Sequence, residues 1–99
     1  MGNHERVVEI ACGKAHTVLR TFSKKVYTFG VGKDGQLGHS TFNYEEQPKI
    51  IKFFDQIKTS HPIQVGTSFN STIVLMSNKK IYWFGTNGTI KNENKPIQL

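Results

Sequence analysis

The stretch that decides the fold occurs twice in the chain, as KKVYTFG at residues 24–30 and as KKIYWFG at residues 79–85. Extended outward, residues 9–30 and 64–85 align without a gap at an offset of 55, with six identical pairs among 22. Self-similarity at a fixed period is the signature of a repeat architecture, in which each unit buries its apolar face only by stacking on a neighbour. The sequence therefore predicts two tandem repeats.

Short segments rich in β-branched and aromatic residues, bounded by Gly, Lys or Asn, indicate four strands in each repeat. The expected strands are residues 7–11, 17–21, 26–30 and 49–53, then 63–65, 72–76, 81–84 and 96–99. No window combines a helix start, an apolar stripe of period 3.6 and a glycine stop, and residues 49–57 come closest. Four short strands at a period near 50 are typical of β-propeller blades.

The predicted fold is thus all-β, with two adjacent four-stranded antiparallel blades. The expected organisation is an N-terminal extension at 1–6, a first repeat at 7–58 and a shorter, degenerate second repeat at 59–99. Two blades leave open strand edges and an uncovered blade face. We therefore expect a segment of a longer ring-forming chain, or a chain that assembles with other material, and no stable free monomer.

The first repeat carries four separated motifs in order, namely IACGKAHTVL at 10–19, VYTFG at 26–30, GQLG at 35–38 and Pro48. Together they resemble the regulator-of-chromosome-condensation repeat. The resemblance implies a propeller that normally has seven blades. It also implies, as one alternative function, guanine-nucleotide exchange on a small GTPase, the activity of the founding member of that family.

The second repeat resembles the family more loosely. Residues 81–85 fit, but residues 66–68 replace Ala-Cys-Gly and Ser71 replaces the histidine. Residues 86–90 stand where the GQLG motif would be. The motifs that match belong to the shared scaffold, so no GTPase-contacting residue is carried over to this chain.

Strand alternation predicts that aromatic residues pair on one face of each blade. Tyr27 shares a face with Phe29, and Tyr82 shares one with Phe84, so that each pair can fill the space between blades. Thr28 and Trp83 then point the opposite way.

Two residues with potentially reactive side chains are predicted to have structural roles. His16, beside the tight Gly13 turn, is predicted to bond a neighbouring backbone group. Cys12 is the only cysteine, which excludes an internal disulfide, and is expected to be a small buried residue.

No catalytic, cofactor or metal site is predicted. The four histidines are scattered without metal-ligand spacing. Residues 30–35 spell G-x-G-x-x-G, but residues 36–40 do not start the helix that a dinucleotide site needs. The protein-binding residues remain unknown, and the connections 31–47 and 86–95, with the lysine-bearing hairpins 23–25 and 77–80, are where we expect them.

Thirteen Lys and Arg against seven Asp and Glu give a net charge of +6, which attracts acidic partners. The lysines occur singly and in pairs, without the long basic runs of nucleic-acid-binding arms. No membrane-length apolar run and no signal peptide are present, so an intracellular location, cytoplasmic or nuclear, is expected.

The sequence accordingly favours a non-enzymatic protein-interaction or scaffolding module that binds other proteins through its loops and exposed blade edges. The alternatives are nucleotide exchange on a small GTPase and a chromatin or nucleic-acid contact through the basic surface.

Overall fold

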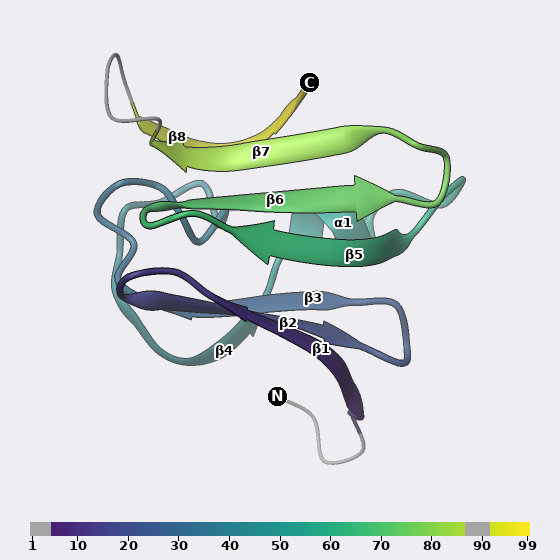
Figure 1. Ribbon diagram of the computed structural model, residues 1–99, viewed down its shortest axis with the longest axis horizontal. Coiled ribbons are helices and arrows are strands. Elements are labelled where there is room, and N and C mark those ends of the chain that lie inside the picture. The colour runs from purple at the N-terminus through teal and green to yellow at the C-terminus, as the bar shows by residue number, and fades with distance from the viewer. Residues whose placement is uncertain (1–4, 87–91) are drawn as a thin grey trace.

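Two four-stranded antiparallel sheets stack face to face in the computed structural model, which describes residues 5–86 and 92–99 (Figure 1). Each sheet is a meander, with its strands hydrogen-bonded in chain order. The strands are β1 (Val7–Cys12), β2 (His16–Thr21), β3 (Val26–Gly30), β4 (Glu45–Ile50), β5 (Pro62–Thr67), β6 (Ser71–Met76), β7 (Ile81–Thr86) and β8 (Asn92–Gln98). The prediction of an all-β chain with two antiparallel blades is confirmed.

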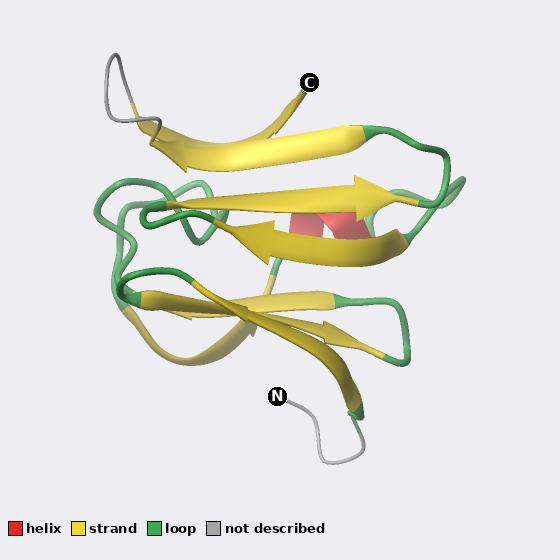
Figure 2. Ribbon diagram, in the orientation of Figure 1, coloured by secondary structure: helices red, strands yellow, loops and turns green. Residues whose placement is uncertain are grey.

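The expected bounds of the fourth strand are wrong in both repeats. The strand expected at 96–99 begins four residues earlier, at Asn92. The strand expected at 49–53 ends at Ile50, and the single helical turn α1 (Lys52–Asp55) follows (Figure 2). The turn brings two apolar side chains three positions apart, Ile51 and Phe54, onto the same side, where both are almost completely buried. An extended segment would have kept only one of them in the core.

The long connections are shorter than expected. β4 begins at Glu45 and β8 at Asn92, so the first connection spans residues 31–44. Residues 87–91, within the second expected connection, lie outside the described residues. No helix follows the G-x-G-x-x-G segment, where turns closed by Gly35 N–H to Gly32 O and Gly38 N–H to Gly35 O occur instead. A dinucleotide site of that kind is therefore excluded.

The core lies between the two sheets. Its buried members come from both blades and from α1 and the residue before it, and are Val18, Val26, Ile51, Phe54, Val65, Val74, Met76 and Phe84. The rings of Phe54 and Phe84 lie 6.3 Å apart, and Phe54 meets Tyr82 edge-on at 5.6 Å. The second aromatic pair thus fills the space between blades, as predicted.

The first aromatic pair faces the other way. Tyr27 is opposite Leu19 in the β2–β3 register, whereas the core residue Val18 is opposite Thr28. The Tyr27 hydroxyl donates to Glu5 Oε2 at 2.8 Å on the far side of the first sheet. Each pair shares a face, but only one pair lies between the two described blades.

The two blades therefore pack through unlike faces. At the repeat offset of 55 residues, the core residues Val18 and Val26 correspond to Ile73 and Ile81, which are 40% and 37% exposed on the outer side of the second sheet. Contact between non-equivalent surfaces is heterologous, and such contacts propagate into rings or open stacks. The outer face of the second sheet is consequently the same surface that the first sheet buries.

Removing one methylene from this core should destabilise the chain measurably. Ile51→Val, at a position with no exposed surface, should lower the free energy of unfolding by about 0.5–1.5 kcal/mol, because it leaves a cavity between the sheets. Ile10→Val makes the same chemical change at a 62% exposed position and should be close to neutral. Denaturant unfolding of both variants checks this, and equal losses would contradict the placement of the core.

Candidate protein-interaction surfaces

A buried chain of polar contacts joins the two blades. His16 Nε2 lies 3.0 Å from Thr72 Oγ1, and that hydroxyl donates to the Gln36 carbonyl oxygen at 2.8 Å. All three residues are at most 2% exposed. Because the only hydroxyl proton goes to Gln36, His16 must donate its Nε2–H, which fixes the tautomer of the ring.

This arrangement corrects the expectation for His16. Its side-chain partner Thr72 belongs to the second repeat, 56 residues away, and not to the segment around Gly13. Gly13 is required beside it, since a Cβ there would collide with the His16 ring and lie 2.7 Å from the Ser68 carbonyl oxygen. His16 is a structural residue, as predicted, but its role is to connect blades.

A second histidine fastens the GQLG segment to β3. Thr28 Oγ1 donates to the Leu37 carbonyl oxygen at 2.7 Å and lies 2.9 Å from His39 Nε2. Thr28 and Leu37 are buried, so the connection after β3 is attached to the edge of the core rather than free. The resemblance located this motif, but not the threonine that holds it.

Cys12 does not occupy the buried position that was expected. It is exposed at the end of β1, opposite Thr17, with its Sγ 4.0 Å from Thr17 Oγ1. It therefore lies on the face of the first sheet that the second sheet does not cover. The expectation failed because burial at this position depends on which face a neighbouring blade covers.

Large apolar side chains are exposed at several places on the described residues, and two groups of them lie on the second blade. The outer face of the second sheet carries a row of exposed aliphatic residues on β6, β7 and β8 and after β8, namely Ile73, Ile81, Ile97 and Leu99. The turn between β5 and β6 exposes 75% of Phe69, next to a hollow of about 880 Å³ that Trp83 also lines. Exposed apolar clusters of this kind mark interaction sites.

Among residues 5–86 and 92–99, no group of three or more His, Cys, Asp or Glu is placed to hold a metal ion. Within the same residues, no helix has the length and apolar character needed to cross a lipid bilayer.

Comparison with known sequences decides the family. The model of the regulator of chromosome condensation (RCC1) repeat matches residues 24–75, and a second RCC1 repeat model matches residues 7–36. The chain belongs to the RCC1 repeat family. The longer match runs from β3 through β6, so the RCC1 sequence unit straddles the two blades instead of coinciding with one of them.

RCC1-repeat relatives are much longer than this chain. The mouse X-linked retinitis pigmentosa GTPase regulator is 41% identical over 86 residues, which cover 86% of this chain and 8% of the relative. The human probable E3 ubiquitin-protein ligase HERC3 is 37% identical over 82 residues, covering 82% of this chain and again 8% of the relative.

Solved structures show the same fold. Human WBSCR16 superposes with a TM-score of 0.83 at 23% identity, covering 99% of this chain and 26% of that protein. Prp20p from Saccharomyces cerevisiae, a protein that binds Gsp1p and histones, superposes with a TM-score of 0.79 at 23% identity and covers 94% and 25%. The chain spans about a quarter of each of these proteins.

Acid should weaken the contact between blades. Burial lowers the pKa of His16 below its usual 6.5, although a hydrogen bond with the Ser71 backbone acts in the opposite direction. Burial, followed by the charge of Lys49, also lowers the pKa of His39. Both histidines then bind protons more readily in the unfolded chain, so their contribution to stability is complete above about pH 6.5 and is lost as pH falls through the folded-state pKa values.

Urea unfolding between pH 7.5 and pH 5 measures this dependence. His16→Gln should flatten it, because the substitution removes one of the two histidines whose pKa is lowered by burial. Stability that rises toward pH 5 in the unsubstituted chain would contradict the assignment.

Removing the Thr72 hydroxyl should leave two buried groups without partners. Thr72→Val should cost about 1–3 kcal/mol of unfolding free energy, because the His16 N–H and the Gln36 carbonyl oxygen lose the hydroxyl between them. Thr17→Val is the matched control at a half-buried threonine and should change stability by less than about 0.5 kcal/mol. Thermal unfolding followed by circular dichroism distinguishes the two, and equal effects would refute the bridging role.

Proposed function

We propose that this chain is a non-enzymatic protein-interaction module that binds through its connecting loops and its uncovered blade surfaces. The observation that carries the proposal is the outer face of the second sheet. That face presents Ile73 and Ile81 to solvent, whereas Val18 and Val26, their counterparts in the first repeat, form the contact between blades. A surface built like a core contact, but left open, suits association with another protein surface.

The partner that fits this face is a further blade of the same kind. The covering surface inside the structure consists of the opposite face of a blade, with Val74, Tyr82 and Phe84. The relatives are several times longer than this chain, which supports further blades as the occupant. The remaining loops would then be available for partners of the assembled protein, in the cytoplasm or the nucleus.

Association through this face is testable with the chain itself. The unsubstituted protein should increase in mass with concentration in sedimentation experiments, and Ile81→Glu should abolish that increase by placing a charge on the apolar face. Phe69→Glu introduces the same charge at an exposed turn and should have little effect. A protein that stays monomeric at every concentration, or an Ile81→Glu variant that associates normally, would refute the proposal.

Nucleotide exchange is the second candidate function. The mouse relative carries the name of a GTPase regulator, and its match covers 86% of this chain. Acceleration of nucleotide release from a small GTPase would favour this candidate. If the chain neither accelerates nucleotide release nor binds a GTPase, nucleotide exchange is excluded and the interaction role remains.

A further inference from the structure

A polar hollow of about 310 Å³ lies between the β2–β3 hairpin turn and the segment that runs from α1 to β5. The β2–β3 turn provides Ser23 and Lys24, the end of α1 provides Asp55, and the connection from α1 to β5 provides Lys58, Ser60 and His61. Its lining comes from two neighbouring segments of this chain, so its donors are brought together without a further blade.

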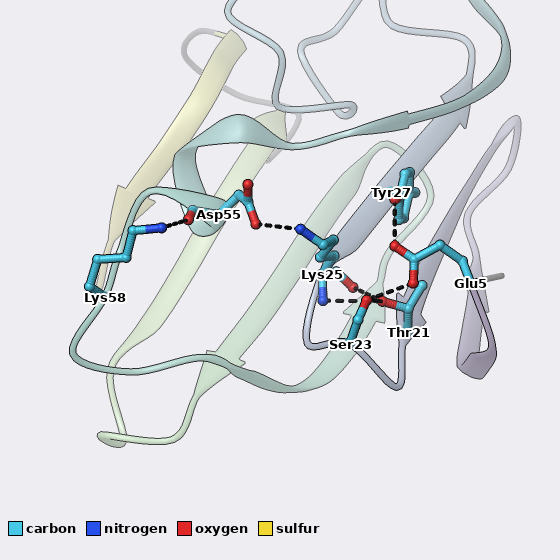
Figure 3. Close-up of polar contacts among 7 residues, drawn as sticks. All are labelled: Glu5, Thr21, Ser23, Lys25, Tyr27, Asp55 and Lys58. Atoms are coloured by element: carbon cyan, nitrogen blue, oxygen red, sulfur yellow. Dashed lines mark hydrogen bonds and ion pairs between the residues drawn. The ribbon is translucent and has the colours of Figure 1, made fainter. Parts of the chain in front are cut away.

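The carboxylates around this hollow already have partners. Asp55 Oδ1 lies 3.1 Å from Lys25 Nζ, and Glu5 accepts hydrogen bonds from the hydroxyls of Ser23 and Tyr27 (Figure 3). Lys58 Nζ donates to the Asp55 backbone oxygen at 3.2 Å, which holds its ammonium group beside the hollow.

Lys24 forms no ion pair with any described carboxylate. Its charge, and two of the three N–H groups of Lys58, are available to an anion.

Two further lining residues add unused hydrogen-bonding groups. Ser60 is nine-tenths buried, and its hydroxyl has no hydrogen-bond partner among the described residues. A buried hydroxyl without a partner costs free energy, and a bound ligand is one way in which such a group becomes satisfied. The His61 N–H donates to Ser77 Oγ at 3.1 Å and the His61 carbonyl oxygen accepts from the Ser77 N–H at 2.8 Å, so the His61 backbone is held beside the hollow that its residue lines.

We propose that this hollow binds a phosphate monoester on a partner protein, that is, a phosphoserine or phosphothreonine side chain. Lys24, Lys58, His61 and Ser60 together offer hydrogen-bond donors and positive charge, which match the oxygens and the roughly double negative charge of a phosphate monoester. The hollow is larger than a phosphate group alone and leaves room for the residue that carries it. Donors gathered at one hollow favour a single phosphate group over a nucleic-acid backbone, which needs charges repeated along a surface.

The inference rests on the proposed interaction role in one respect, namely that the phosphate is carried by a partner protein. Binding of free phosphate to the hollow can be measured separately. The probes are inorganic phosphate, O-phosphoserine and a short peptide in phosphoserine, serine and glutamate forms. Amide chemical shifts of the full chain report both the affinity and the place of binding. Residues 23–25 and 55–61 should shift together, and the phosphoserine peptide should bind at least about tenfold more tightly than the other two forms.

The repeat supplies a matched control for the lysine. Lys24 and Lys79 occupy the same position in their hairpin turns, at φ 71° and 75°, but only Lys24 lines the hollow. Asn tolerates that conformation, so Lys24→Asn and Lys79→Asn each remove one charge without straining the turn. Lys24→Asn should weaken phosphate binding about tenfold, because one charge-assisted hydrogen bond is lost. Lys79→Asn should weaken it by less than twofold.

Ser60→Ala separates a binding role from a structural one. It removes an unpaired hydroxyl, so it should leave stability unchanged or slightly increased while weakening phosphate binding.

Three outcomes would overturn the inference. One is an equal loss of binding in Lys24→Asn and Lys79→Asn, which would indicate diffuse attraction to a basic surface. Another is equal affinity for the phosphoserine and glutamate peptides, and the third is no shift with millimolar phosphate. Association through Ile81 is measured without phosphate, so failure here leaves the proposed function standing.

Discussion

Packing of one sheet face against the unlike face of the next sheet is the contact on which the rest of the structure depends. A single four-stranded sheet of this size cannot bury its apolar face by itself, so it is not stable alone in water. Here Val18 and Val26 of the first sheet form one core with Val74 and Phe84 of the second, and α1 adds Phe54. The buried His16–Thr72–Gln36 chain gives this otherwise non-directional contact a defined register.

The fold was predictable because its signals are local. The alternation in KKVYTFG and KKIYWFG identified strands, and their recurrence identified the blades. Features that depend on distant residues were not predictable in this way. The partner of His16 lies 56 residues away, and the exposure of Cys12 depends on which face another blade covers. The α1 turn was missed because four residues are too few to show a helical period.

The candidate binding residues differ in how far they can be predicted from the sequence. The lysine pairs of the two hairpins are visible as a repeat, but only the structure shows that Lys24 lines a hollow and Lys79 does not. Ser60 belongs to no motif, and its importance follows from its burial without a partner. The two proposals thus assign different tasks to the two kinds of surface, with apolar sheet faces for stacking blades and polar turns for binding a partner.

Native-state hydrogen exchange of the full chain tests the central claim most directly. If unlike-face packing makes the two blades one cooperative unit, the buried amides of β2 and β6, at Val18 and Val74, should exchange only through a common opening with the same free energy. If the amide of Val74 exchanges through an opening of much lower free energy than that of Val18, the blades fold independently and the account is contradicted.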